Sequence, residues 1–310
     1  MENERAGMKQ ESIFSTLGKQ GTTVNANGLD FHIIESGPED GQLLVFLHGF
    51  PEFWYSWRYQ IPWFAEKGFR VLVPDQRGYN LSAKPGRIAD YRLDKLAEDV
   101  IAIMDSYGRE KAHIVGHDWG GAVAWWLAMN HPEKLEKVAF LNMPHPLVLL
   151  RHIKTNPRQR ERSKYFFMFQ FPFLPEYRLK KNNWEMARKV LQNSSRDGTF
   201  TDEDLQFYID AWAQPKAIRS MINWYRAMLR KRPARPATVR VQAPSLILWG
   251  KQDLFLGKEL AAESARLCDE VKVEFLTEAT HWLQHEEPEK VNDLLYDFLA
   301  SPEDKHKKTR

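Results

Sequence analysis

The chain has 310 residues, of which 43% are hydrophobic, and its 44 basic and 41 acidic side chains give a net charge of +3. This balance indicates a globular protein and favours neither a nucleic-acid partner nor an anionic membrane. The single cysteine, Cys268, excludes an intrachain disulfide and a cysteine-based metal cluster, and we expect it to be buried. No signal-like segment and no run of about 18 apolar residues occurs, so we expect a soluble, cytoplasmic protein.

The first third of the chain alternates strand and turn signals. Residues 1–21 are polar and predict a flexible N-terminal segment. Strand patterns follow at residues 29–34, 43–47 and 70–73. The last two are short apolar runs, typical of strands that are buried on both faces of a parallel sheet.

The second of these strands runs into HGFPE at residues 48–52, followed by a cluster of aromatic residues. Some hydrolases carry their nucleophile at a sharp turn between a strand and a helix. In these enzymes, the loop at the position of residues 48–52 supplies a backbone N–H to the oxyanion hole. Phe50 is the candidate donor, and its bond to Pro51 is a candidate cis peptide bond. The alternative is an ordinary X-Pro turn.

The segment 112–122, AHIVGHDWGGA, has the pattern of a nucleophile elbow, in which a strand turns sharply into a helix. Asp118 stands at the apex, and Gly116 and Gly120 let the two backbones approach each other. A carboxylate at this place is suited to displacing a leaving group from saturated carbon and forming an alkyl ester. The alternative is that Asp118 is only the N-cap of the next helix.

Other elements connect these motifs. Strand 70–73 leads into a turn-rich loop whose Asp75 and Arg77 we interpret as structural. Residues 91–107 carry apolar side chains at helical spacing before the elbow. Strand 137–141 follows the elbow helix and ends at Asn142, which cannot ionise.

About a hundred residues separate strand 137–141 from the next strand pattern, far more than a usual connection. Residues 147–238 are aromatic and helical in pattern, and predict a helical cap over the carboxyl ends of the strands, where substrates of open α/β sheets bind. The prediction is therefore a mostly parallel central sheet flanked by helices, with core segments at 22–146 and 239–300, the cap between them, and a charged tail at 301–310.

Two late strands end next to polar residues. Strand 245–249 leads to Asp253, and strand 271–276 leads to His281. The order nucleophile, acid, histidine is the order expected of this hydrolase topology, so we predict a triad of Asp118, Asp253 and His281. The alternatives are that Asp253 is a turn residue and that His281 is a loop histidine bonded to the backbone.

Together, HGFPE at 48–52, DQRGY at 75–79 and GHDWG at 116–120 resemble the core motifs of the α/β-hydrolase epoxide hydrolases, and the likeness covers nearly the whole chain. Asn80 departs from the family pattern, in which a glycine is usual. Because Asn tolerates left-handed backbone, we expect little consequence.

The resemblance extends to the cap, where YFFMFQ at 165–170 and NWYR at 223–226 are similar to the segments that carry the family's ring-opening tyrosines. It implies this role for Tyr165 and Tyr225. Independently, Tyr225 shares a helical stripe with Met221, Trp224 and Met228, so its hydroxyl should point from an apolar face. The alternative is a core tyrosine bonded to a backbone carbonyl.

The resemblance implies a cofactor-free, metal-free enzyme that converts an epoxide to a vicinal diol through an ester on Asp118. His281, oriented by Asp253, would activate the water that hydrolyses this ester, and the N–H groups of Phe50 and Trp119 would face the oxyanion. The implied partner is a small-molecule epoxide, with no nucleic acid and no membrane, and the protein would be a monomer or homodimer. We expect the substrate pocket to be lined by His48, Pro51, Trp54, Phe169, Trp224 and Trp282.

Two other functions stay open. Dehalogenases share an Asp nucleophile followed by Trp. However, many haloalkane dehalogenases have a halide-binding Asn at the position of Phe50, and fluoroacetate dehalogenases resemble one another in carrying Arg at the position of Trp119. A catalytically silent binding protein on the same fold is the second alternative, and the complete triad with both tyrosines argues against it.

Overall fold

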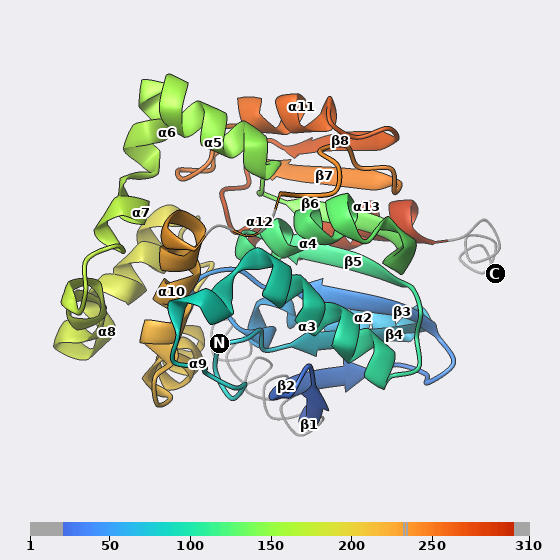
Figure 1. Cartoon of the computed structure of the whole chain (residues 1–310), viewed down its shortest axis with the longest axis horizontal. Coiled ribbons are helices and arrows are strands. Elements are labelled where there is room, and N and C mark those ends of the chain that lie inside the picture. The colour runs from blue at the N-terminus through green and yellow to red at the C-terminus, as the bar shows by residue number, and fades with distance from the viewer. Residues whose placement is uncertain (1–20, 232, 234, 301–310) are drawn as a thin grey trace.

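The computed structural model describes residues 21–231, 233 and 235–300 (Figure 1). The expected flexible segment 1–21, apart from its last residue, and the expected charged tail 301–310 lie outside the described residues.

One eight-stranded sheet organises the described part of the chain, in the order β1-β2-β4-β3-β5-β6-β7-β8. β2 pairs antiparallel with β1 and β4, and every other pair is parallel. β5 and β7 are buried along their whole length, as expected of strands covered on both faces. The strands are β1 (Gly21–Ala26), β2 (Leu29–Ser36), β3 (Gln42–Leu47), β4 (Phe69–Pro74), β5 (Ala112–His117), β6 (Leu135–Leu141), β7 (Ser245–Gly250) and β8 (Val271–Leu276).

Helices flank the sheet (Figure 1). α4 packs against β5, β6 and α3, and α2 packs against β4 and α13. α4 is apolar on all sides because it lies between the sheet and α3, and its residues from Trp119 to Met129 are buried. The core helices are α2 (Gln60–Glu66), α3 (Leu93–Ser106), α4 (Trp119–Asn130), α11 (Glu259–Ala265), α12 (Leu283–Glu286) and α13 (Pro288–Leu299), with short 3-10 turns η1 (Trp54–Trp57), η2 (Ile88–Tyr91) and η3 (Pro132–Lys134).

A set of helices, which we call the inserted helices, separates β6 from β7 and lies together at one end of the sheet (Figure 1). Thr201 and Asp204 form a reciprocal capping box at the start of α9. The backbone leaves helical geometry at residues 181–184, so α8 is kinked. The inserted helices are α5 (Pro146–Thr155), α6 (Pro157–Arg162), α7 (Lys164–Met168), α8 (Leu174–Ser194), α9 (Asp202–Ala213) and α10 (Ala217–Arg230).

The predicted mostly parallel sheet flanked by helices is confirmed, and each predicted strand is present within two residues of its expected ends. Cys268 is buried, as expected. β1 was not predicted. Its exposed Thr22 and Thr23 give no clear apolar alternation, and it forms through antiparallel pairing with β2.

Candidate active site

Asp118 occupies the sharp turn between β5 and α4, with φ 49° and ψ −121°. A side chain on Gly120 would collide with the carbonyl oxygen of Leu47, and one on Gly116 would collide with the carbonyl oxygen of Gly120. The two glycines are therefore required for this turn. Asp118 stands at the N-cap position of α4, but its side chain makes no capping hydrogen bond to the helix.

The Asp118 carboxylate is bounded by two groups from distant parts of the chain. The backbone N–H of Phe50 donates to Oδ1 of Asp118 at 2.9 Å. Nε2 of His281 lies 3.7 Å from Oδ2 of Asp118. The Phe50–Pro51 peptide bond is cis, as the sequence suggested.

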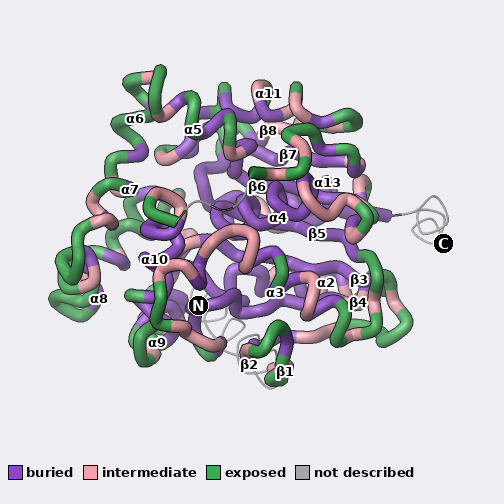
Figure 2. The backbone as a smooth tube through the Cα atoms, in the orientation of Figure 1, coloured by how far each residue is buried: buried purple, intermediate pink, exposed green. Residues whose placement is uncertain are grey.

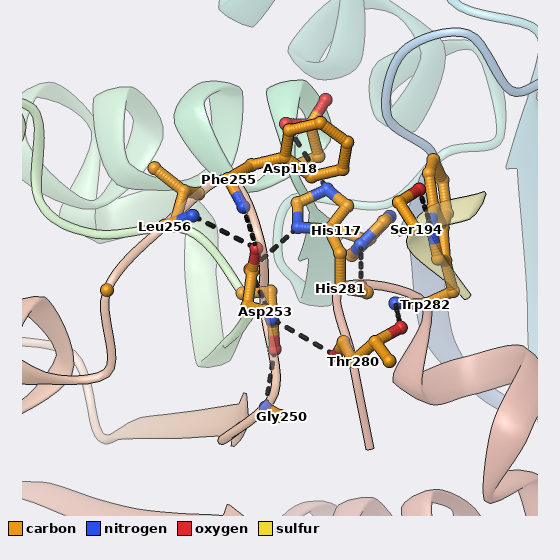
Figure 3. A network of polar contacts seen from close by, with 12 residues as sticks. His117, Asp118, Ser194, Gly250, Asp253, Phe255, Leu256, Thr280, His281 and Trp282 are labelled. Atoms are coloured by element: carbon orange, nitrogen blue, oxygen red, sulfur yellow. Dashed lines mark hydrogen bonds and ion pairs between the residues drawn. The ribbon is translucent and has the colours of Figure 1, made fainter. Parts of the chain in front are cut away.

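Asp253 orients His281 from the other side of the ring. Nδ1 of His281 lies 2.8 Å from Oδ2 of Asp253 (Figure 3). The other carboxylate oxygen of Asp253 accepts the backbone N–H groups of Phe255 and Leu256, at 2.7 and 3.0 Å. Asn142 donates from Nδ2 to Oδ2 of Asp253 at 2.5 Å. Asp253 is thus held by four donors. Its bonds to Phe255 and Leu256 are those of a turn residue, and its other oxygen also contacts Asn142 and the ring of His281.

The charges of this cluster shift the pKa values of its members. Burial alone would lower the pKa of His281, but the carboxylate of Asp253, aided by Asp118, raises it to about 9. Burial opposes ionisation of Asp253, yet the charge and hydrogen bond of His281 hold the pKa of Asp253 below its ordinary value. Asp253 therefore stays a carboxylate.

The inserted helices place two tyrosines over Asp118. Tyr165 comes from α7 and Tyr225 from α10, and their ring centroids are 5.8 Å apart. The ring of Tyr225 packs edge-on against Trp119 and Phe50, at 5.0 and 5.2 Å between centroids. Burial raises the pKa of both phenols well above 10, and the nearby Asp118 charge adds to the shift. Both tyrosines are therefore protonated donors at neutral pH.

Asp118, His281 and both tyrosines line one apolar cavity of about 150 Å³. Pro51, Phe169 and Trp282 line it, as predicted. The inserted helices supply further apolar side chains that the sequence did not identify, because their positions depend on how these helices pack: Met168, Leu179, Met186, Ala187, Val190, Trp212 and Ile218.

His48, Trp54 and Trp224 were also predicted to line the pocket, and this prediction is wrong, because none of them lines the cavity. Nε2 of His48 accepts the backbone N–H of Gln76 at 3.0 Å. Trp54 is buried in the core. The indole N–H of Trp224 donates to the carbonyl of Arg77 at 3.0 Å. His48 and Trp224 thus contact the loop after β4, and Trp54 packs in the core.

A buried network behind the triad was missed by sequence reasoning. Nδ1 of His117 lies 2.9 Å from Glu52, and its Nε2 lies 2.8 Å from the carbonyl oxygen of His281. Nε2 of His285 contacts the other Glu52 oxygen at 2.7 Å. Burial opposes ionisation of Glu52, but the bonds from His117 and His285 hold its pKa well below the usual range. Glu52 lies in the HGFPE motif and His117 directly precedes Asp118. These positions within the motifs were the sequence evidence from which the network could have been predicted.

An open groove of about 620 Å³ adjoins the cavity and is walled mainly by α8. Met186, Val190 and Phe255 line both the groove and the cavity. Three cationic residues, Arg178, Lys181 and Lys189, line the groove. The cavity is thus separated from solvent by the side chains of α8 and the loop after β7.

Within the described residues, no group of three or more His, Cys, Asp or Glu side chains is arranged to hold a metal ion. In the same part of the chain, no helix is long and apolar enough to span a membrane.

Comparison with known proteins agrees with this geometry. Residues 42–288 match the family described as alpha/beta hydrolase fold. The AB hydrolase superfamily protein YfhM of Bacillus subtilis is 45% identical, covering 90% of this chain and 97% of that protein. Human epoxide hydrolase 4 is 38% identical, over 89% of this chain and 77% of the relative. A variant of an epoxide hydrolase from Bacillus megaterium, solved with its product, a naphthyloxy-propane-1,2-diol, is 33% identical with a TM-score of 0.83, over 90% and 99% of the two chains.

Proposed function

Because the chain belongs to the α/β-hydrolase fold family and is similar over most of its length to epoxide hydrolases, we propose that it is an enzyme that converts epoxides to vicinal diols. The observation that carries the proposal is the shared cavity: Asp118, His281 and two protonated tyrosines face the same apolar space.

Asp118 is the nucleophile in this proposal. The Oδ2 atom attacks one epoxide carbon, the carbon–oxygen bond to the ring oxygen breaks, and the product is an alkyl ester on Asp118. The Phe50 N–H on Oδ1 fixes the carboxylate in one orientation. The mostly apolar lining of the cavity leaves few groups that would compete for hydrogen bonds with the nucleophile.

Tyr165 and Tyr225 supply the proton that ring opening requires. As the carbon–oxygen bond breaks, negative charge develops on the ring oxygen, and a phenol donates a proton to it. The aromatic contacts of Tyr225 with Trp119, Phe50 and Phe169 fix its ring, so the hydroxyl needs little reorganisation.

His281 then activates the water that hydrolyses the ester. Neutral His281 takes a proton from water through Nε2, and the hydroxide attacks the carbonyl carbon of Asp118. Asp253 stabilises the imidazolium that forms, as it holds Nδ1 at 2.8 Å. The N–H groups of Phe50 and Trp119 face the tetrahedral oxyanion, and its collapse breaks the bond between the carbonyl carbon and the ester oxygen. The departing oxygen takes the proton of the added hydroxyl, which completes the diol and restores the carboxylate. The imidazolium of His281 then gives up its proton, and the phenolate left by ring opening takes one up.

A haloalkane or haloacetate dehalogenase is the principal alternative, because it would use the same nucleophile, base and acid. A halide leaves as a stable anion and needs no proton. The two phenols over Asp118 favour an epoxide, because a departing alkoxide needs a transferred proton and a halide does not. A silent binding protein would have no use for the oriented pair of His281 and Asp253.

The deciding experiment measures diol formation from a panel of small and bulky epoxides, and halide release from alkyl halides, with the same preparation. We expect diol formation and no halide release. Halide release without diol formation would replace the proposal with dehalogenase activity. If neither a diol nor a halide is formed, the catalytically silent binding protein is the alternative that remains.

The inserted helices would form a cap domain at 147–238 that closes the active site between the core segments 22–146 and 239–300. A cytoplasmic location and a monomeric or homodimeric state remain predictions.

A further inference from the structure

Four large aromatic side chains are exposed on one short stretch of the inserted helices. Phe167, Phe171, Phe173 and Tyr177 are 51%, 59%, 73% and 63% exposed, and Leu174 between them is also exposed. They lie within eleven residues of sequence, on α7, the turn after it and the first turn of α8. Aromatic side chains grouped on a surface in this way mark an interaction site more often than isolated ones do.

Backbone hydrogen bonds order the segments that carry these side chains. The N–H groups of Gln170 and Phe171 donate to the carbonyls of Phe167 and Met168, which continues the helical turn of α7. The N–H of Tyr177 donates to the carbonyl of Phe173. Phe167 and Phe171 are therefore one turn apart, and so are Phe173 and Tyr177. We call these four residues and Leu174 the aromatic patch.

Basic residues surround the aromatic patch. Residues 157–194 contain nine Lys and Arg but only three acidic residues. Each of these acids is already paired with a cation: Glu161 with Lys164, Glu176 with Arg226, and Glu185 with Lys189. Lys164, Arg178, Lys180 and Lys181 are exposed next to the patch. The net charge of +3 for the whole chain conceals this local excess.

We propose that the aromatic patch and its basic border form a docking surface for anionic lipid membranes. Exposed aromatic side chains insert at the level of the headgroups, and the surrounding lysines and arginines attract anionic lipids. This revises the expectation of no membrane partner, which rested on the charge balance of the whole chain. In this proposal the folded protein binds at the membrane surface.

The charge favours a membrane over a second copy of the chain. Pairing two such faces would bring like charges together, whereas an anionic bilayer is complementary to them. The groove on α8 also reaches this border, since Arg178 follows Tyr177 in the chain and lines the groove. Figure 1 places α7 and α8 at the edge of the molecule, and Figure 2 shows α8 as largely exposed. An apolar substrate dissolved in the bilayer would thus have a short path to the cavity.

The test is sedimentation with vesicles of pure phosphatidylcholine, or of phosphatidylcholine with about 30% phosphatidylglycerol. The wild-type chain should bind the anionic vesicles and dissociate from them as the salt concentration rises, because added salt screens the electrostatic attraction. Phe171→Ser with Phe173→Ser should lower the partition coefficient at least about tenfold. Lys164→Glu with Lys180→Glu should lower it by about fivefold for each cation removed.

The matched control is Lys67→Glu with Lys290→Glu, which makes the same change in net charge. Both residues are exposed, and they lie at the end of α2 and in α13, at the other end of the molecule from α7 and α8 (Figure 1). This variant should bind vesicles nearly as well as the wild type. Equal loss in the control, or unchanged binding in both patch variants, would contradict the docking surface.

Light scattering separates membrane docking from self-association. If the wild type is a dimer that the Phe171→Ser, Phe173→Ser variant dissociates, and neither binds vesicles, the patch is an interface between copies and the proposal is overturned. Diol formation from a water-soluble epoxide without vesicles should be unchanged in the patch variants. Vesicle binding without any diol formation would leave the docking surface intact and remove only the proposed enzyme activity.

Discussion

The backbone N–H of Phe50 donates to Oδ1 of Asp118 at 2.9 Å, while Oδ2 of the same carboxylate faces His281. The two oxygens are therefore not equivalent. The oxygen held by Phe50 is placed to become the ester carbonyl and then the oxyanion, and Oδ2 is placed to form the bond to carbon. In the proposed reaction, Oδ2 leaves the protein in the diol and water replaces it.

This difference predicts the fate of labelled oxygen. A single turnover in heavy-oxygen water should place the label in the Asp118 carboxylate and leave the first diol unlabelled, because water attacks the carbonyl carbon and not the alkyl carbon. Mass spectrometry of the Asp118 peptide and of the diol measures both. Label in the first diol would show that water opens the ring directly and that Asp118 is only a base.

His281→Gln should stop hydrolysis of the ester far more than its formation, because Asp118 attacks the epoxide without help from a base. The ester should accumulate, and intact-protein mass spectrometry should show an adduct with the mass of the epoxide on the Asp118 peptide. His131→Gln, a histidine near the surface that contacts Glu133, is the control and should accumulate no ester. An adduct on any other residue would remove Asp118 from its role.

The hydrolysis step should depend on pH through His281, whose pKa Asp253 and Asp118 raise to about 9. Asp253, Asp118 and Glu52 add negative charge around the ring, and the ring of His117 packs 4.8 Å from it. Esterification removes the charge of Asp118, so the pKa of His281 should fall below about 9 in the intermediate. Below that pKa the ring is protonated and cannot accept a proton, so hydrolysis should slow about tenfold per pH unit.

Rapid-quench measurement of the ester fraction should show more ester at about pH 5 than at about pH 9. Asp253→Asn removes the main charge that raises the pKa of His281. The pH at which the rate of ester hydrolysis begins to fall should therefore be lower in this variant. A hydrolysis rate that does not change with pH in the wild type would contradict the role of His281 as the base.

The motifs at the carboxyl ends of the strands could be predicted because short-range sequence determines them. Gly116, Asp118 and Gly120 specify a strand–helix turn in five residues, and the apolar runs before Asp253 and His281 specify buried strands. The order of the strands in a parallel sheet then brings their ends together. The contacts among Asp118, Asp253 and His281 follow from that topology.

The pocket and the inserted helices could not be predicted as well, because they depend on helix packing over long sequence separations. Arg226 is an arginine that its sequence neighbourhood does not distinguish from a surface residue, yet it is buried and paired with Glu176, 50 residues away. It also donates to the carbonyls of Phe169 and Phe171. Aromatic residues close to motifs, such as Trp224, pack into the core, and spacing alone does not distinguish them from Tyr225.

The choice between epoxide and halide rests on Tyr165 and Tyr225. An epoxide expels a strongly basic alkoxide, so ring opening needs a proton donor, while a halide leaves as a stable anion. Burial and the Asp118 charge raise the pKa of both phenols well above 10, which keeps them protonated at neutral pH. The two hydroxyls can therefore share the donation, and the loss of one should leave part of the activity.

Tyr165→Phe or Tyr225→Phe should each slow ester formation about a hundredfold, the value of one general acid, because each change removes one donor and leaves the ring packing in place. The double variant should be nearly inactive in ester formation while its thermal unfolding stays cooperative. Tyr177→Phe, an exposed tyrosine of the same inserted helices, is the matched control and should be unchanged. Stopped-flow measurement of ester formation under single-turnover conditions reads the step directly. If the double variant forms the ester at the wild-type rate, both tyrosines are core residues, and the preference for epoxide over halide loses its main support.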